Sequence, residues 1–286
     1  MSKLFSNFVR VIKTSFMSAS EKSILYDELP FWSAPFGLLL LDTVKYKKNI
    51  RVLDIGCGYG FPMLELANRL GKGSEVHGLD PSDDAIEVLK EKIRLRAVAN
   101  AFAVRGMGEY MPFGHDVFDL IISNNGLNNV NDQGKVLDEC FRVCKPGAQM
   151  VLTMNLPHTM MEFYDALRSV LENLDLQDCI TAMDAHILDK RKPVEYLQEL
   201  VSDHGFLITS VQPDGFKYRF TSARAFYDHY LIKHFFLPHW KAFLPEGRQE
   251  QILSKAAVIL DREAAETGYL EISVPFVCFD CRKSGI

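Results

Sequence analysis

Residues 52–60 read Val-Leu-Asp-Ile-Gly-Cys-Gly-Tyr-Gly, and the prediction for the whole chain begins from them. The apolar, β-branched run from Ile50 to Ile55 predicts a buried strand, and apolar residues at helical spacing from Met63 to Leu70 predict a helix. Glycines at alternate positions allow a tight turn between these elements and let the backbone approach a ligand closely. The helix N-terminus after the turn offers N–H groups to an anion such as a carboxylate. We therefore predict a strand, a ligand-binding turn and a helix.

The same alternation of elements continues along the chain. Gly71 and Gly73 end the first helix, and the segment Asp80-Pro81-Ser82 opens the second. We expect further strands at residues 75–79, 101–105, 118–122, 149–154, 207–212 and 270–279, and helices at 82–93, 133–144, 160–174 and 193–204. A long aromatic segment, residues 222–268, is predicted to be a helical insertion between the last two strands. Strands that alternate with helices imply a parallel sheet covered on both faces.

Composition excludes several classes of protein. The chain has 286 residues, with 32 Lys and Arg against 37 Asp and Glu, so its net charge is −5 and nucleic acid is not the expected partner. Six cysteines without a secretory signal favour reduced thiols and a cytoplasmic location. Cys278 and Cys281 form a close pair, but no second pair completes a tetrahedral site, and no metal is expected.

The N-terminal segment is basic and amphipathic. No apolar run reaches the roughly 20 residues that span a bilayer, so no transmembrane segment is expected. Within residues 1–17, Lys3, Arg10 and Lys13 are not opposed by an acid, and apolar residues recur at helical spacing. Three interpretations stay open: a helix that covers the active site or a partner surface, a peripheral membrane contact, and a targeting peptide. The sequence leaves the oligomeric state open.

Four ordered motifs carry a resemblance to a known family. Asp80 stands at the end of the second strand, at the distance where nucleotide-binding folds hold ribose hydroxyls. With it, the segments 52–60, 76–82, 106–113 and 118–130 resemble class I S-adenosylmethionine (SAM)-dependent methyltransferases of the ubiquinone/menaquinone-biosynthesis type. The Val143-Cys144-Lys145-Pro146-Gly147 turn also fits this resemblance, which covers about residues 45–156. It implies an α/β Rossmann-like sheet that is mostly parallel, with an antiparallel last strand, flanking helices and an N-terminal helical extension.

The resemblance also implies where SAM would bind. Asp54 and the backbone of Gly56, Cys57, Gly58 and Gly60 would hold its methionine part. The Asp80 carboxylate, beside Pro81, would accept both ribose hydroxyls, because two acceptor oxygens match two vicinal donors. Met107, Gly108 and Glu109 would face the adenine, and Asn124 would lie beside the sulfonium.

Two positions depart from the family's pattern. The family usually has an acid at the position of Met107, where it accepts a bond from the adenine amino group; a backbone carbonyl or Glu109 could replace it. Asn128 stands where relatives often carry His or Arg.

The acceptor side is predicted less directly. Residues 1–44 are expected to form a helical extension or lid, with Trp32 and Phe36 placed where relatives have a cofactor lid. Residues 45–286 would form the methyltransferase domain, with a SAM-binding core at 45–156 and an acceptor lid at 222–268 that includes Tyr227 and Tyr230. His158, after the fifth strand, is the first candidate for a general base, followed by His229, His234 and His239. Core packing is the competing interpretation for the aromatic residues.

The expected function is transfer of a methyl group from SAM, which leaves S-adenosylhomocysteine, to a small-molecule acceptor. That acceptor is a quinone-like or aromatic oxygen or carbon, or a small thiol or amine. One alternative is a non-catalytic SAM-binding regulatory protein. Another is a nicotinamide-dependent oxidoreductase, although the glycine spacing i, i+2, i+4 differs from the dinucleotide fingerprint.

Overall fold

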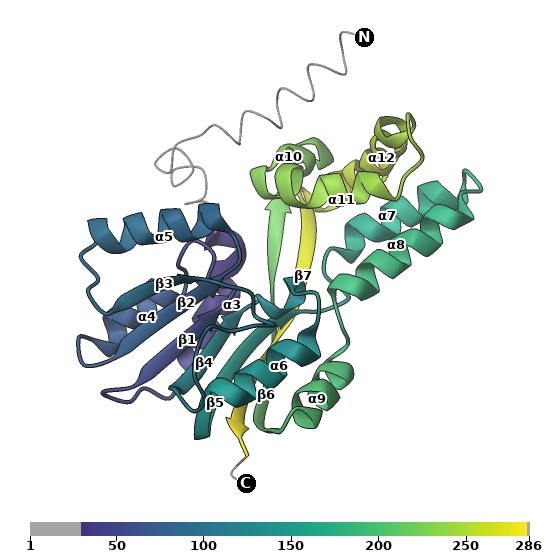
Figure 1. Ribbon diagram of the computed structural model, residues 1–286. Coiled ribbons are helices and arrows are strands. Elements are labelled where there is room, and N and C mark those ends of the chain that lie inside the picture. The colour runs from purple at the N-terminus through teal and green to yellow at the C-terminus, as the bar shows by residue number, and fades with distance from the viewer. Residues whose placement is uncertain (1–29, 285–286) are drawn as a thin grey trace. The chain divides into compact units, whose positions relative to one another are not determined.

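The computed structural model describes residues 30–284, so the segment 1–17 and most of the predicted N-terminal extension lie outside the described residues. The chain divides into two compact units (Figure 1). Of the described residues, one unit contains 30–151 together with 282–284, and the other spans Leu152–Cys281.

The first unit alternates strands and helices as predicted. Its elements are, in order, α3 (Pro30–Thr43), β1 (Arg51–Ile55), α4 (Met63–Leu70), β2 (Glu75–Asp80), α5 (Asp83–Leu95), β3 (Ala101–Arg105), β4 (Phe118–Asn124), the 3₁₀ turn η1 (Leu127–Asn129) and α6 (Gln133–Val143). The strand β5 (Cys144–Asn155) runs from this unit into the other.

The strands of the first unit pair in parallel. β1 pairs with β2 from Arg51↔Glu75 to Ile55↔Leu79, and on its other side it pairs with β4. Across the described residues the strand order is β3-β2-β1-β4-β5-β7-β6, where β6 is Phe206–Phe220 and β7 is Leu270–Lys283. The mostly parallel sheet and the antiparallel last strand confirm the predicted fold class. The order reverses between β1 and β4, which is where open α/β sheets bind ligands.

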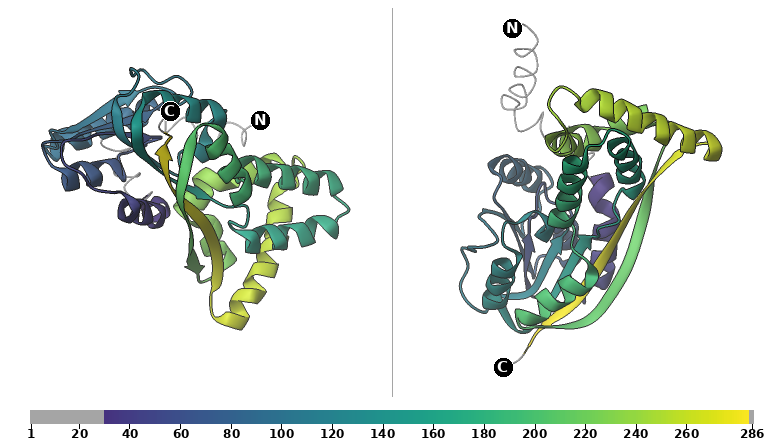
Figure 2. Two further views of the ribbon diagram at one scale, coloured as in Figure 1. Left: turned by 90° about the horizontal axis from the view of Figure 1, so that it is seen from below. Right: turned by 90° about the vertical axis from the view of Figure 1, so that its right-hand side faces the viewer.

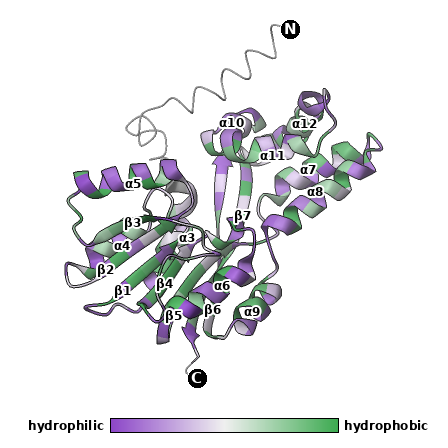
Figure 3. Ribbon diagram, in the orientation of Figure 1, coloured by the Kyte–Doolittle hydropathy of each residue, from purple (hydrophilic) through white to green (hydrophobic). Residues whose placement is uncertain are grey.

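Apolar side chains explain why these elements form. Val52 and Leu53 of β1 and Ile121 and Ile122 of β4 are fully buried, and Figure 3 shows hydrophobic residues concentrated in these central strands. A strand buried on both faces reads as a continuous apolar run, as observed here. Ser82 is the N-cap of helix α5, and its side chain accepts a hydrogen bond from the Ala85 backbone N–H.

The second unit combines helices with two long strands. Its helices are α7 (Met161–Glu172), α8 (Gln177–Lys190), α9 (Val194–Asp203), α10 (Ala223–Asp228), the π-helical turn η2 (Ile232–Phe236), α11 (Leu237–Ala242) and α12 (Gln249–Thr267). The segment between β6 and β7 is helical, as predicted. Figure 2 shows β6 and β7 side by side.

An aromatic cluster forms the core of the second unit. The ring of Trp240 stacks on Phe163 with a centroid distance of 3.9 Å, and its Nε1–H donates to the Tyr164 hydroxyl at 2.9 Å. Phe226 stacks on the same indole ring. These aromatic side chains of the insertion and of α7 are therefore packed in a core, which is the competing interpretation stated above.

Two elements of the second unit differ from the prediction. The strand β6 extends to Phe220, well beyond the expected residues 207–212, because β7 is a long strand and provides partners for it. The helix α8 was not predicted. Its buried residues Ile180, Met183 and Ile187 form only a narrow apolar stripe, which gives a weak periodic signal.

Candidate functional site

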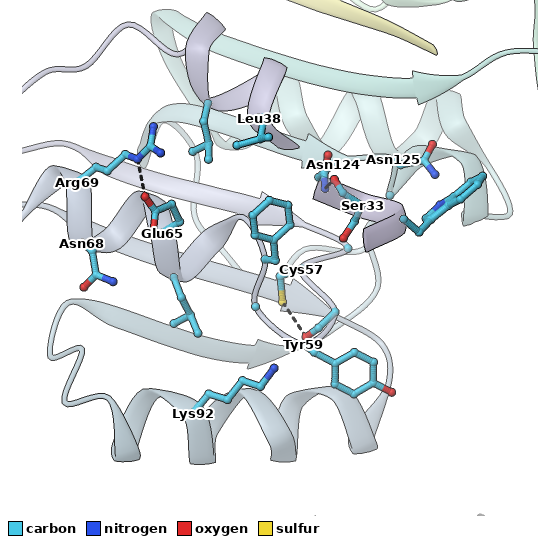
Figure 4. A pocket seen from close by; sticks show the side chains of 18 of the residues that line it. Ser33, Leu38, Cys57, Tyr59, Glu65, Asn68, Arg69, Lys92, Asn124 and Asn125 are labelled. Carbon is cyan, nitrogen blue, oxygen red and sulfur yellow. Dashed lines mark hydrogen bonds and ion pairs between the residues drawn. The ribbon is translucent and has the colours of Figure 1, made fainter. Parts of the chain in front are cut away.

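A cavity of about 560 Å³ in the first unit opens where the strand order reverses. Figure 4 shows side chains around this space from the turn after β1, from α4 and α5, and from the end of β4. Its walls also include residues of α3. The lining residues include Trp32, Ser33, Leu38, Leu41, Gly56, Cys57, Gly58, Gly60, Phe61, Leu64, Asn124, Asn125 and Gly126.

The glycine turn after β1 has a conformation that requires glycine. The backbone N–H groups of Gly56 and Cys57 both donate to the Leu79 carbonyl, at 2.8 and 3.2 Å, which ties the turn to β2. Gly58 has a φ of +50°, and a Cβ added to it would have no described atom within 4 Å. Its backbone therefore borders open space, as a turn that accepts a ligand requires.

Asp80 holds this turn from the end of β2. Its Oδ2 accepts a hydrogen bond from the Gly58 backbone N–H at 2.9 Å, and its Oδ1 accepts one from the Ser82 backbone N–H at 2.9 Å. A carboxylate has about four acceptor positions, so each oxygen can accept a further bond. Asp80 thus orders the turn and keeps the capacity to bind two hydroxyl groups.

Asp54 lies in a different environment from Asp80. Its side chain is fully buried, and neither carboxylate oxygen has a hydrogen-bond partner of ordinary geometry among the described residues. Burial raises the pKa of Asp54 well above its ordinary value, the charge of Asp80 raises it further, and the Met63 backbone N–H opposes the rise. Asp54 does not line the cavity.

The loop after β4 lines the cavity next to the glycine turn, since a Cβ on Gly56 would lie 3.1 Å from the Gly126 Cα. The Asn124 side chain donates from Nδ2 to the Ser33 carbonyl at 3.1 Å, which connects β4 to α3. The Asn128 side chain is buried and donates from Nδ2 to Oδ1 of Asn125. Asn124 and Asn125 therefore present amide groups to the cavity, while Asn128 supports the loop from behind.

The two predicted lid residues have different positions. Their rings are neighbours, with centroids 5.7 Å apart. Trp32 lines the cavity, whereas Phe36 is fully buried. The site also includes apolar residues that the sequence analysis did not single out, above all Phe61 with Leu38. A glycine within the predicted helical extension, Gly37, was the available signal of a close contact. In the structure a Cβ at this position would overlap the Phe61 ring.

The residues predicted to face adenine lie outside the cavity lining. The Met107 side chain is 43% exposed, and its carbonyl accepts from the Tyr110 backbone N–H at 3.2 Å. Glu109 is buried, and its Oε1 accepts from the backbone N–H groups of Asn131 at 3.0 Å and Asp132 at 3.4 Å. Glu109 therefore stabilises the segment before α6. Adenine binding by these residues, and by their neighbour Gly108, stays a prediction, as does the role of Pro81.

The predicted acceptor-side residues belong to the second unit. His158 is exposed and borders a separate cavity of about 550 Å³ together with residues such as Phe216, Lys217 and Pro275. Tyr227 donates from its hydroxyl to the Leu253 carbonyl at 3.3 Å. Tyr230 lies against His234, with ring centroids 4.6 Å apart. The roles of His158, Tyr227 and Tyr230 are not tested by this geometry and stay predictions.

Residues 30–284 contain no group of three or more His, Cys, Asp or Glu side chains placed to hold a metal ion. Over the same residues, no helix has the length and apolar character needed to cross a bilayer.

Comparison with known proteins places the geometry in a wider context. A family model described as a methyltransferase domain matches residues 46–205. The demethylmenaquinone methyltransferase of Geobacillus sp. (strain WCH70) is 34% identical over 125 residues, which is 43% of this chain and 53% of that protein. The corresponding protein of Lactiplantibacillus plantarum is 38% identical over 104 residues, 36% of this chain and 44% of its own length. The chain thus spans about half the length of the curated relatives it matches.

Solved structures share the fold. A putative methyltransferase from Bacillus halodurans has a TM-score of 0.59 at 16% identity, covering 87% of this chain and 99% of that one. The YcgJ protein from Bacillus subtilis has a TM-score of 0.56 at 19% identity, with coverage of 88% and 98%. At such identities the likeness concerns the fold alone.

Proposed function

The chain belongs to the methyltransferase-domain family, and from this premise we propose that it binds SAM in the cavity between β1 and β4 and methylates a small molecule. The observation that carries the proposal is the pair of acids beside the open turn: Asp80 holds Gly58, and Asp54, whose buried carboxyl has no partner of ordinary geometry among the described residues, lies near the end of β1 just before the turn. SAM has an ammonium, a sulfonium and one carboxylate, and so carries a net positive charge. A site with two acids and exposed backbone at Gly58 fits such a ligand.

Each residue of the site would have a distinct part in holding the cofactor. The second acceptor positions of Asp80 would take the two ribose hydroxyls. The glycine turn and the N-terminus of α4 would lie against the amino-acid part, and the amide of Asn124 would border the reacting centre. When bound, SAM supplies an electrophilic methyl group on sulfur. The contribution of the chain is to align an acceptor atom with that group at roughly 3 to 3.5 Å, which can supply a large part of the rate.

The acceptor is proposed to be quinone-like or aromatic. The support is the apolar wall that Trp32, Leu38 and Phe61 form on the cavity, together with the similarity to proteins named as demethylmenaquinone methyltransferases. A flat apolar ring would bury surface against this wall. A small thiol or amine is the alternative acceptor, since either becomes a nucleophile without a base in the protein.

The helical insertion at residues 222–268 is proposed to contribute to acceptor binding, with His158 as a general base. Tyr230 is only partly buried, and its ring lies against the rings of His234 and Phe235. If this proposal is right, Tyr230→Ala lowers the turnover of the acceptor without changing the affinity for S-adenosylhomocysteine. If the variant and the wild type had equal turnover, the acceptor would not bind at this part of the insertion.

Calorimetric titration of the purified full chain with SAM, S-adenosylhomocysteine and NAD tests the proposal directly. We expect binding of the first two ligands and none of NAD. Binding of NAD alone would favour the oxidoreductase alternative. A panel of a naphthoquinol, a catechol, a thiol and an amine then identifies the acceptor by formation of S-adenosylhomocysteine. Tight cofactor binding without turnover on any member of such panels is the outcome expected of a non-catalytic regulatory protein.

A further inference from the structure

Asp54 and Asp80 are neighbouring acids with opposite surroundings. Both oxygens of Asp80 accept backbone hydrogen bonds, so its negative charge is stabilised. Both oxygens of Asp54 are buried and lack a partner of ordinary geometry among the described residues. An ionised carboxyl group in such surroundings is costly, and buried groups of this kind respond by becoming neutral.

The groups that face Asp54 reinforce this conclusion. Asp80, at the end of β2, adds a like charge. Cys57, in the turn, has a thiol whose pKa is raised by burial, by Asp54 and by Asp80, so the thiol favours its neutral form. From α4, the Met63 backbone N–H favours the ionised form. Burial and the charge of Asp80 therefore both favour the protonated form of Asp54, and only the Met63 backbone N–H, among the described residues, favours the ionised form.

We propose that Asp54 carries a proton in the free protein and releases it when a ligand with an ammonium group binds at the glycine turn, so that cofactor binding is coupled to proton release. This inference rests on the proposed function, because it takes SAM or S-adenosylhomocysteine as the ligand. The Oδ–H bond breaks, its electron pair stays on the carboxylate and the proton passes to the buffer. The ammonium group that both ligands carry would then be attracted to the new negative charge of Asp54.

The sign of the pH dependence follows from this exchange. A ligand that favours the ionised form competes with the proton, so its affinity rises with pH until Asp54 is ionised in the free protein. The effect requires charge on the ligand. 5′-Methylthioadenosine keeps the nucleoside and the sulfur but lacks the amino-acid part, and its binding should release no proton.

Isothermal titration of the full chain in phosphate and in Tris at one pH measures the protons released, because the two buffers differ in their heat of ionisation. We expect up to about one proton to be released on binding S-adenosylhomocysteine. The isosteric variant Asp54→Asn should bind the same ligand with no release and with an affinity independent of pH. In Asp80→Asn the loss of the like charge should move the rise of affinity to lower pH.

Two results would overturn the inference: S-adenosylhomocysteine binding to the wild-type chain with no proton released at any pH, or release that persists in Asp54→Asn. A chain that binds neither ligand would instead refute the proposed function, so the two failures are distinct. If Asp54→Asn does not fold, infrared difference spectra of the wild-type chain decide the question. The protonated carboxyl band should disappear on ligand binding, and an unchanged spectrum would contradict the proposal.

Discussion

Gly126, in the loop after β4, packs tightly against the end of β1 and the glycine turn, and its replacement by alanine should be destabilising. The φ and ψ of Gly126 are −73° and −40°, so alanine can adopt the backbone conformation without strain. A Cβ at this position would, however, lie 2.5 Å from the Ile55 carbonyl oxygen and 2.6 Å from the Ser123 Oγ. Since one of these atoms is backbone, the end of β1 or the loop must move. Overpacking of this kind costs about 1–3 kcal/mol.

Urea denaturation and a thermal melt of Gly126→Ala measure this cost. Each kcal/mol lowers the Tm of a chain of this size class by about 2–4 °C, so we expect a fall of roughly 2–12 °C. Gly114→Ala is the matched control, because the nearest described atom to a Cβ there is 3.8 Å away. The control should stay within about 0.5 kcal/mol of the wild type. Equal stability of the two variants would refute the steric argument and the tight contact between loop and turn on which it depends.

Three further predictions concern both units. Asp80→Ala removes the carboxylate that is proposed to accept the ribose hydroxyls, together with the acceptor of the Gly58 N–H. Since a hydrogen bond to a charged group contributes about 1.5–3 kcal/mol, calorimetry should find S-adenosylhomocysteine bound roughly 10- to 100-fold more weakly. An unchanged Kd would contradict the cofactor assignment. Trp240→Phe removes the 2.9 Å hydrogen bond to Tyr164 and should lower the free energy of unfolding in urea by about 1–2 kcal/mol, whereas no change would mean that this bond contributes nothing net. Burial, followed by the charge of Arg191, lowers the pKa of His186 from 6.5 to about 4. As pH falls from about 6.5 to about 4, the unfolded chain therefore binds a proton that the folded chain does not, and the free energy of unfolding decreases. The urea midpoint of His186→Gln should depend less on pH there, and identical profiles would contradict this role.

Local patterns in the sequence were sufficient for most of the fold. The run before residue 56, the glycine turn and the helix that follows depend on neighbours along the chain, and the parallel alternation after them follows from the same periodicities. The positions of Gly58 and Asp80 at the ends of adjacent strands could likewise be predicted, because parallel strands end at the same edge of a sheet. Longer-range consequences, such as the extension of β6 along β7, could not be predicted, since pairing depends on a partner distant in the sequence.

The environment of each candidate side chain was decided by the tertiary structure alone. Asp54 and Asp80 are both acids beside the turn, yet packing buries one without partners and gives the other two backbone donors. Glu109 is predicted to face adenine, and only the fold shows that its carboxylate also accepts a hydrogen bond from the segment before α6. The order of elements and the glycine turn follow from local conformational preference, so local patterns in the sequence were enough to predict them. Burial, hydrogen-bond partners and therefore protonation depend on which distant segments meet, and only the folded chain sets them.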